Sequence, residues 1–373
     1  MSEQAVQGQG LRFRLGRIPV SMPWSAWVGI LVIAYLWLGS FERVTETGTE
    51  AIVMAGVFAV LFYVSILGHE LAHAWVARAS GNPVQGITLW GFGGYTSYER
   101  RNVTPLREGL IAAAGPAMTV VIGLVLRSVA ENAATLDLRV GVLLYALGIS
   151  NIYLGVFNAL PGLPLDGGAV LRSVVWAITG DQHRATIVAA WAGRVVAVGA
   201  FLWFVVPAFT RGGSPDLSVI VFGAIISAWM FAGANQALKS AQVMSRVPGI
   251  SASSLARRAV VVAADTPLSE ALRRAQESGA TALVVADSDG RPMGVARPEA
   301  VVAVPEERRP WVPVSSVSAA IPAGTVIPAG LQGPDLLAAL QAAPAAQYLV
   351  VPADGSWVGV LTTADVEAAL TRR

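Results

Sequence analysis

The sequence predicts a polytopic α-helical membrane protein with a smaller α/β region at its carboxyl end. Hydrophobic residues make up 54% of the 373 residues and charged residues only 13%, against about 25% charged residues in an ordinary soluble domain. Six apolar runs, each near the roughly 20 residues that a bilayer requires, fill most of the first 240 residues. After about residue 245, short β-branched runs alternate with helical segments instead.

The six apolar runs define a predicted membrane domain at residues 23–240. They lie at residues 23–40, 51–76, 109–127, 140–160, 187–209 and 217–238. The first run is not followed by the small-residue cleavage site that ends a signal peptide, so we interpret it as a transmembrane helix. A polar segment, residues 1–22, precedes it.

The basic residues predict the orientation of these spans, because cytoplasmic loops carry an excess of Arg and Lys. One side of the predicted topology holds most of them: Arg12, Arg14, Arg17, Arg78, Arg100, Arg101, Arg107, Arg172, Arg184, Lys239 and Arg246. The opposite loops hold only Arg43, Arg127, Arg139 and Arg211. We therefore expect both termini, and the segment 1–22, in the cytoplasm. A single Lys among many Arg residues, with a bias to Ala, Val and Gly, indicates a GC-rich bacterial genome.

Two of the three histidines lie in the second apolar run, within the motif His69-Glu70-Leu71-Ala72-His73. Positions i and i+4 of a helix share one face, so both imidazoles can bind one metal ion. Glu70 is offset around the helix, where it can contact a water molecule rather than the metal. The alternative is two core histidines and a buried Glu, but three ionisable groups in a membrane helix are costly unless they have a function.

The fourth apolar run ends in a stretch that contains Asn158 and Asp166, broken by two prolines and followed by Gly167 and Gly168. Catalytic zinc typically takes three protein ligands and leaves one position for water, so Asp166 is a candidate third ligand. Asp is also a common turn residue, which is the alternative. Asn158 could donate a hydrogen bond to a developing oxyanion, or it could form an ordinary interhelical hydrogen bond.

Residues 87–98 combine β-branched and aromatic residues around a glycine-rich centre, which predicts a short hairpin. Its centre consists of Gly91, Phe92, Gly93 and Gly94. Exposed backbone there could pair with an extended peptide by strand addition. An ordinary surface loop is the alternative.

Three other features receive no chemical role. Gly115-Pro116 kinks the third run and could help it pack against the histidine-bearing helix, or could be plain structure. Arg194, inside the fifth run, could snorkel to the surface or pair with an acidic group. His183 is expected in a solvated loop.

The region after residue 245 contains an internal duplication. Asp289-Gly290 and Gly294 recur as Asp354-Gly355 and Gly359 at a constant offset, within two similar β-α-β-β-α patterns. We place the two repeats at residues 246–304 and 305–373.

Together these motifs resemble the site-2 protease family of intramembrane metalloproteases. The similarity is to the members with six transmembrane helices, a three-helix catalytic core and a C-terminal pair of CBS domains. An HExxH motif inside a membrane span, followed by a stretch that ends in Leu-Asp-Gly-Gly, carries the resemblance. It implies one zinc ion per chain on His69, His73 and Asp166, with Glu70 as general base and acid. Asn158 matches the asparagine that precedes the third ligand in the family.

The resemblance also implies the remaining parts of the site. Gly91 to Gly94 is similar to the glycine-containing hairpin beside the family's active site. The CBS pattern for an adenine nucleotide is present in the second repeat, at Thr362 and Asp365, and absent from the first, where Arg297 and Ala300 stand instead. A helix cap is the alternative role for Thr362 and Asp365.

The resemblance implies regulated intramembrane proteolysis in a bacterial cell membrane. The expected substrates are membrane-tethered proteins such as regulators or anti-sigma factors, and the CBS pair could form a homodimer. A CBS-regulated transporter or channel is the main alternative, but its polar residues would be spread over several helices rather than concentrated in two motifs. A catalytically silent, nucleotide-sensing scaffold is a third reading. The sequence has no basic cluster interleaved with aromatic residues, so no nucleic-acid partner is expected. It has no Cys, which excludes thiolate zinc sites.

Overall fold

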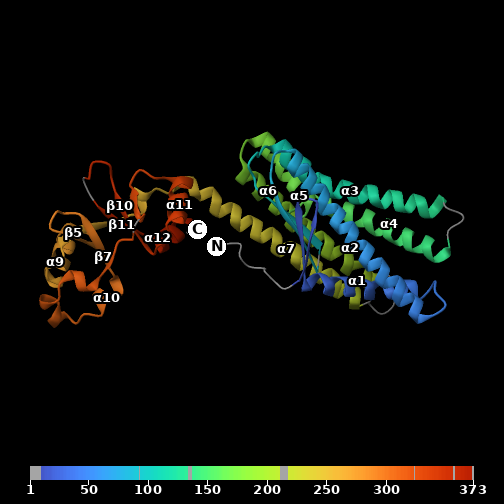
Figure 1. Ribbon diagram of the computed structural model, residues 1–373, viewed down its shortest axis with the longest axis horizontal. Helices are drawn as coiled ribbons and strands as arrows, with labels where there is room; N and C mark the ends of the chain where they lie inside the picture. Colours follow the sequence, from blue (N-terminus) through green and yellow to red (C-terminus); the bar gives the residue numbers. More distant parts are fainter. Residues whose placement is uncertain are drawn as a thin grey trace. The chain divides into compact units, whose positions relative to one another are not determined.

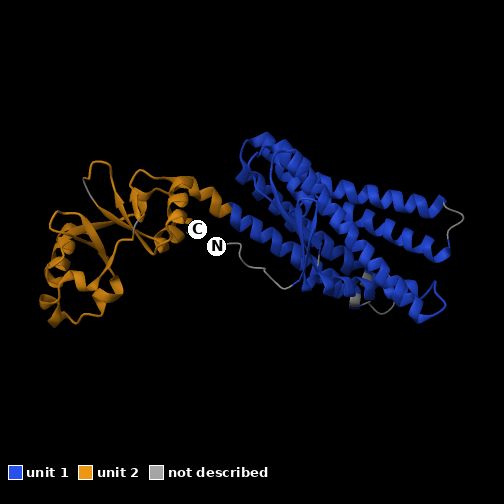
Figure 2. Ribbon diagram, in the orientation of Figure 1, with its two compact units in different colours: residues 1–241 blue, residues 242–373 orange. Residues whose placement is uncertain are grey.

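A computed structural model of the chain divides into two compact units, Met1–Ala241 and Gln242–Arg373 (Figure 1 and Figure 2). The structure describes residues 10–91, 93–132, 137–210, 217–322, 324–355 and 358–371. Unit 1 is a helical bundle with one small sheet, and unit 2 is an α/β unit. This arrangement confirms the predicted fold class.

The described part of unit 1 contains seven helices, and the last of them ends at the start of unit 2. They are α1 (Trp24–Phe41), α2 (Gly48–Ala79), α3 (Pro105–Asn132), α4 (Leu138–Asn158), α5 (Asp166–Thr179), α6 (Gln182–Thr210) and α7 (Leu217–Arg246). Within the described ranges, six helices are long and apolar enough to cross a membrane, and they coincide with the six predicted spans. The exception, α5, follows the loop after α4.

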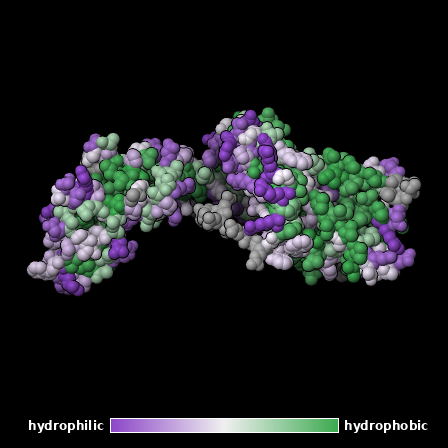
Figure 3. Space-filling model, in the orientation of Figure 1, coloured by the Kyte–Doolittle hydropathy of each residue, from purple (hydrophilic) through white to green (hydrophobic). Residues whose placement is uncertain are grey.

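Large apolar side chains cover the outside of unit 1. Leu31, Val64, Val121 and Val195, from four different helices, are all more than half exposed. Figure 3 shows an apolar band on this face of unit 1, with polar residues at its two ends. A helix that is apolar on all sides is typical of a membrane span. Unit 1 is therefore the multi-pass membrane part of the protein.

Unit 1 also contains a four-stranded sheet in the order β1-β2-β3-β4. Its strands are β1 (Gly10–Leu15), β2 (Ile18–Pro23), β3 (Val84–Trp90) and β4 (Gly93–Tyr98). The β3–β4 pair is antiparallel and confirms the hairpin predicted at residues 87–98. The first two strands lie in the segment 1–22, for which we predicted no strands. β2 joins them to the hairpin by pairing in parallel with β3.

One face of this sheet packs against α1 and α2. Ile18, Val20, Ile87 and Leu89 point to that face and are almost fully buried, in one core cluster with Ala26 and Tyr63. The hydroxyl of Tyr63 also lies 3.2 Å from the carbonyl oxygens of both Trp90 and Gly91 at the hairpin turn. The helix that carries the HExxH motif therefore holds the hairpin at a fixed position.

Unit 2 contains a seven-stranded sheet in the order β8-β7-β6-β5-β11-β10-β9. Its strands are β5 (Arg257–Ala263), β6 (Ala282–Ala286), β7 (Pro292–Ala296), β8 (Ser318–Ala320), β9 (Val326–Pro328), β10 (Gln347–Val351) and β11 (Gly359–Thr362). Its α-helices and 3-10 helices are η1 (Val247–Gly249), α8 (Ala252–Leu255), α9 (Leu268–Ser278), α10 (Pro298–Val302), η2 (Glu306–Trp311), η3 (Val314–Val317), α11 (Gly333–Ala342) and α12 (Thr363–Thr371).

The pairing in unit 2 follows the internal duplication. β5 pairs in parallel with β6, which pairs antiparallel with β7. In the second repeat β9 pairs in parallel with β10, which pairs antiparallel with β11. The two repeats meet where β11 pairs with β5. The duplication seen in the sequence is thus also a duplication of the strand pairing.

A buried carboxylate connects three elements of unit 1. Glu108 of α3 is only 4% exposed. It accepts a hydrogen bond of 2.8 Å from Arg100, which follows β4, and one of 2.9 Å from Arg172 of α5. Removing one member of a buried ion pair leaves an uncompensated charge, so this cluster should hold α3, α5 and the hairpin together.

We predict that Glu108→Ala lowers the free energy of unfolding by about 3 kcal/mol, because Arg172 loses its carboxylate inside the bundle. The measurement is thermal or denaturant unfolding of the whole chain in detergent micelles. Glu131→Ala is the matched control, because Glu131 forms an exposed i,i+4 pair with Arg127 on the same helix. Such a pair contributes at most about 1 kcal/mol. Equal effects of the two substitutions would contradict the prediction.

Candidate metal centre

Three metal-binding side chains meet in unit 1. His69 and His73 extend from α2, and Asp166 is the first residue of α5. The Nε2 atoms of the two histidines are 3.1 Å apart. Oδ2 of Asp166 lies 3.0 Å from Nε2 of His69 and 3.4 Å from Nε2 of His73. Within the described residues this is the one group of three or more His and acidic side chains with metal-binding geometry.

Local geometry explains how Asp166 reaches the histidines. Its two successors, Gly167 and Gly168, pack against the backbone of the preceding loop. A Cβ atom at Gly167 would lie 2.2 Å from the carbonyl oxygen of Ala159, and one at Gly168 would lie 2.2 Å from the carbonyl carbon of Gly162. The Asp-Gly-Gly sequence therefore lets α5 begin directly on the loop, which brings its first side chain to α2.

The tautomer of His73 is set by a backbone contact. Its Nδ1 lies 2.7 Å from the carbonyl oxygen of Ile111 in α3. A carbonyl only accepts hydrogen bonds, so Nδ1 carries the proton and the lone pair of Nε2 points at the cluster. Metal-binding histidines typically have such a partner on the other ring nitrogen. Nδ1 of His69, in contrast, is buried without a partner among the described atoms.

The three ligand atoms fit a zinc ion. Tetrahedral coordination at about 2.0 to 2.1 Å places neighbouring ligand atoms about 3.3 Å apart, and the observed separations of 3.0 to 3.4 Å lie close to this value. Two imidazole nitrogens and a carboxylate oxygen are also ligand types that zinc binds in proteins. Three protein ligands leave a fourth position for water.

Gly115 of α3 forms one wall of the site. A Cβ atom there would lie 2.3 Å from Nε2 of His73 and 2.5 Å from Nε2 of His69. The absence of a side chain thus leaves the ligand atoms free to bind a metal. The sequence drew attention to Gly115-Pro116 as a kink. It did not reveal that Gly115 faces the two imidazoles.

Glu70 lies beside the ligands without joining them. Its side chain is buried, and Oε2 accepts a hydrogen bond of 2.7 Å from the hydroxyl of Thr96 in β4. The neighbouring strand residue, Gly94, is so close that an added Cβ would lie 2.6 Å from Cγ of Glu70. Strand β4 therefore runs directly past this carboxylate. Sequence reasoning missed Thr96, although its place in the predicted hairpin was the available signal.

Comparison with known proteins agrees with this geometry. The profile described as Peptidase family M50 matches residues 57–132 and 128–203, which include both histidines, Glu70 and Asp166. The membrane part of this chain is thus similar to peptidase family M50 over these residues. The resemblance to the site-2 proteases is thereby confirmed. A CBS-domain profile matches residues 252–305 of unit 2.

Curated relatives of this chain carry the name zinc metalloprotease. A Synechocystis sp. protein provisionally named zinc metalloprotease sll0528 is 32% identical over 235 residues, 62% of this chain and 60% of that protein. A Mycobacterium tuberculosis protein provisionally named zinc metalloprotease Rip3 is 40% identical over 195 residues, which is 49% of each chain. The chain thus spans about half to three fifths of the length of these relatives.

Among solved structures, the site-2 protease from Methanocaldococcus jannaschii is similar to this chain. It shares 26% identity, with a TM-score of 0.44 over 62% of this chain and 95% of that chain.

The other predicted residues of unit 1 lie in several places. Asn158 is the last residue of α4 and is half-buried, and the described contacts include no side-chain hydrogen bond from it. Gly91 and Gly93 lie at the hairpin turn, and Phe92 is outside the described residues. His183 was predicted in a loop but lies in the first turn of α6.

Arg194 forms no ion pair with an acidic group among the described residues. Its guanidinium donates to the side-chain oxygen of Asn235 in α7 and lies 4.4 Å from the ring centroid of Trp191. These contacts join α6 to α7, so the structure gives Arg194 a packing role.

In unit 2, Thr362 and Asp365 form a helix cap at α12. The hydroxyl of Thr362 accepts a hydrogen bond from the backbone N–H of Asp365, and the Asp365 carboxylate accepts one of 2.6 Å from that hydroxyl. Arg257 of β5 binds the same carboxylate through Nε and Nη2. The hydrogen bonds from Arg257 hold the pKa of Asp365 below its usual range. The capping alternative is therefore present in the structure.

We predict that Gly115→Ala removes zinc without unfolding the chain. The new methyl group would occupy the space beside both Nε2 atoms, whereas Ala is favoured over Gly inside a helix by about 1 kcal/mol. Zinc per purified chain, measured by inductively coupled plasma mass spectrometry, should fall from about one to near zero, with helical circular dichroism unchanged. Gly141→Ala in α4 is the control, because no atom lies within 4 Å of that position. Full zinc content in Gly115→Ala would refute the assignment of a zinc site next to Gly115.

We predict a pH-dependent contribution from Asp365. A lowered folded-state pKa means that the Arg257 pair stabilises the protein above about pH 4, the ordinary Asp value, and that this contribution is lost as the pH falls through the folded-state pKa. The difference in unfolding midpoint between wild type and Asp365→Asn should shrink as the pH is lowered from about 7 to about 3. Asp335→Asn, at a carboxyl without an ion pair among the described residues, should show no such trend. A difference in unfolding midpoint that stays constant with pH would disprove the stabilising role of the Arg257–Asp365 pair.

Proposed function

We propose that this chain is an intramembrane zinc endopeptidase, which hydrolyses peptide bonds in or near the transmembrane helices of other membrane proteins. The observation that carries the proposal is the meeting of His69, His73 and Asp166 inside an apolar helical bundle, with the Glu70 carboxylate beside them. The match to the profile of peptidase family M50 and the names of the relatives support it.

The chemistry follows from the residues present. His69, His73 and Asp166 would hold a zinc ion, which would make a water molecule more acidic and supply positive charge for the developing oxyanion. Glu70 takes a proton from the attacking water as the water oxygen bonds to the peptide carbonyl carbon. It returns the proton to the amine nitrogen as the carbon–nitrogen bond breaks. The hydrogen bond from Thr96 orients the carboxylate. Asn158 remains a candidate donor to the oxyanion.

The substrate must be extended when it reacts. The backbone groups of a membrane helix are hydrogen-bonded within the helix, so the helix has to unwind before its carbonyl can be attacked. β4 is an edge strand of the sheet and passes Glu70 at Gly94. We propose that unwound substrate pairs with the hairpin at Gly91, Gly93 and Gly94 by strand addition, which would place its backbone next to the carboxylate.

The cellular setting is part of the proposal. Charge distribution supports a bacterial cell membrane location with both termini in the cytoplasm. Membrane-tethered regulators such as anti-sigma factors are the proposed substrate class. The CBS part is proposed to regulate cleavage and to contribute to a homodimer. An adenine nucleotide at Thr362 and Asp365 would have to compete with Arg257 for the Asp365 carboxylate.

A CBS-regulated transporter is the weaker alternative. Its ion pathway would need polar groups along several helices. In the described membrane part, the polar groups of metal-binding geometry form a single cluster at His69, His73 and Asp166.

We predict that Glu70→Gln retains zinc but lowers cleavage by at least about a hundredfold, the range expected for loss of a general base. The measurement compares new N-termini in the membrane proteomes of cells that express either the wild type or the variant. Glu99→Gln is the control, because Glu99 pairs with Arg101 at the surface. His69→Ala should lose both zinc and cleavage. Undiminished cleavage by Glu70→Gln would exclude the proposed role.

A further inference from the structure

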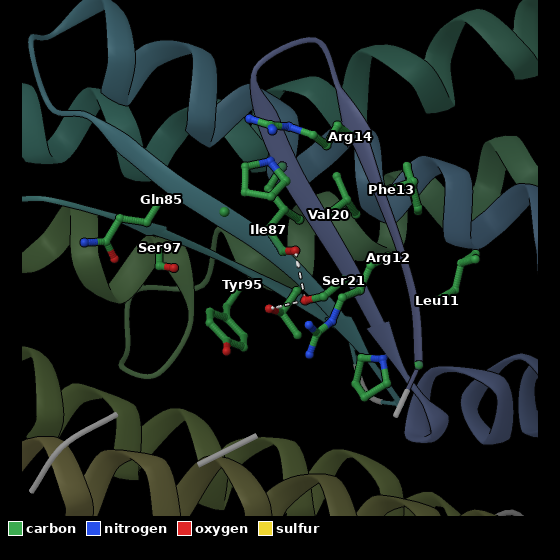
Figure 4. Close-up of a pocket in the computed structure, with 15 residues that line it drawn as sticks. Leu11, Arg12, Phe13, Arg14, Val20, Ser21, Gln85, Ile87, Tyr95 and Ser97 are labelled. Atoms are coloured by element: carbon green, nitrogen blue, oxygen red, sulfur yellow. Dashed lines mark hydrogen bonds between the residues drawn. The ribbon is translucent and has the colours of Figure 1, made fainter. Parts of the chain in front are cut away.

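The four-stranded sheet of unit 1 has a second face that carries polar residues. A groove of about 470 Å³ runs over this face (Figure 4). Its polar lining includes Arg12 and Arg14 of β1, Ser21 of β2, Thr88 of β3, and Tyr95 and Ser97 of β4. We call it the sheet groove. Its volume lies within the range of ligand-binding sites, about 300 to 1,000 Å³.

Strand register explains why these side chains share one face. Arg12 pairs with Ser21, Ser21 with Thr88, and Thr88 with Tyr95, so one row of side chains crosses all four strands. The Ser21 and Thr88 hydroxyls in the middle of the row are hydrogen-bonded at 2.9 Å. Because side chains alternate along a strand, Arg14 extends to the same side as Arg12, one step further along.

Figure 4 shows both arginines on the side of the sheet where Tyr95 lies, whereas Leu11 and Phe13 extend to the other side. Arg12 and Arg14 are exposed, and in the part of the chain that the structure describes neither forms an ion pair. The groove therefore presents two uncompensated positive charges above a floor of hydroxyl groups.

Strand β4 separates this groove from the catalytic residues. Its residues alternate, so Tyr95 and Ser97 line the sheet groove while the intervening Thr96 binds Glu70. A ligand in the groove thus lies on one face of β4, and Glu70 lies on the other face. The substrate strand that we propose would pair along the free edge of β4.

We propose that the sheet groove binds an acidic, extended segment of the substrate, next to the helix that is cleaved. This inference rests on the proposed function and adds a recognition site to it. Two positions along a strand span about 6.8 Å, so carboxylates at alternate positions of an extended peptide match the spacing of Arg12 and Arg14. Arginine binds carboxylates through two parallel hydrogen bonds. The Ser21–Thr88 pair and Tyr95 can bind the peptide backbone.

The polar floor favours a peptide over a lipid. Arg12, Ser21, Thr88 and Tyr95 form a continuous row of hydrogen-bonding side chains across the four strands, which the regularly spaced polar groups of an extended peptide can match. The groove would also select among substrates. Membrane helices usually carry Lys and Arg on their cytoplasmic flank, and the two arginines would repel them. Helices with an acidic flank would be retained.

Peptide binding to the full chain tests the proposal. The chain carries Glu70→Gln, so that nothing is cleaved, and is purified in uncharged detergent micelles. The probe is a fluorescein-labelled six-residue peptide with glutamates at its second and fourth positions, and its match has glutamines there. Fluorescence anisotropy should show binding of the acidic peptide about tenfold tighter, as expected for charge-assisted Arg–carboxylate bonds. The double variant Arg12→Glu/Arg14→Glu should abolish this preference.

Arg17→Glu is the matched control, because Arg17 lies in the β1–β2 turn outside the groove lining. It should retain binding within about twofold, since exposed charges at a distance are screened by salt. Equal binding of both peptides, or equal losses in Arg17→Glu and the double variant, would overturn the proposal.

Two further arms identify other occupants. If the double variant loses binding to phosphatidylglycerol vesicles while peptide binding is unchanged, the groove is a lipid site and the proposal fails. If deletion of residues 2–9 strengthens peptide binding about tenfold, that segment is the occupant and the proposal also fails. If the wild-type chain binds the acidic peptide normally but cleaves no substrate, the proposed function fails and the proposal for the groove stands.

Discussion

Three electron-pair donors from two helices meet within 3.4 Å inside an apolar bundle, and much of the surrounding structure serves this contact. Helix α2 presents both imidazoles on one face. The backbone of α3 fixes the proton of His73 through Ile111, and the missing side chain of Gly115 leaves space for a metal. The glycines after Asp166 let α5 start against its own loop. A cation bound at this point would use all of these features together.

Two other charged groups of the bundle, Glu108 and Arg194, contact partners that join helices. Glu108 is buried with two arginines that come from the hairpin exit and from α5, the helix that begins with Asp166. Arg194 uses an amide and aromatic rings to join α6 to α7. These contacts use charge to fix helices relative to one another, since an isolated charge in such surroundings is costly. The HExxH glutamate is distinct, because Thr96 orients it without neutralising it.

The small sheet has two separate roles because a strand presents its side chains alternately to two faces. Its apolar face anchors the hairpin on α1 and α2, with the hydroxyl of Tyr63 at the turn. Its polar face carries Arg12 and Arg14, and between the two faces the edge strand β4 passes Glu70. The sheet thus places the Glu70 carboxylate, a free strand edge and a basic groove next to one another.

The sequence alone determined the six spans, the hairpin, the duplication and the candidates His69, Glu70, His73 and Asp166. Spacing and apolar length are local properties, and a buried ionisable motif is conspicuous in an apolar chain. Tertiary structure decided what depends on contacts between distant segments. Gly115 and Thr96 reach the site from other elements, and β1 and β2 join a sheet completed by residues about 70 positions later. Such contacts leave no local pattern, because each is made by residues that are ordinary in their own segment.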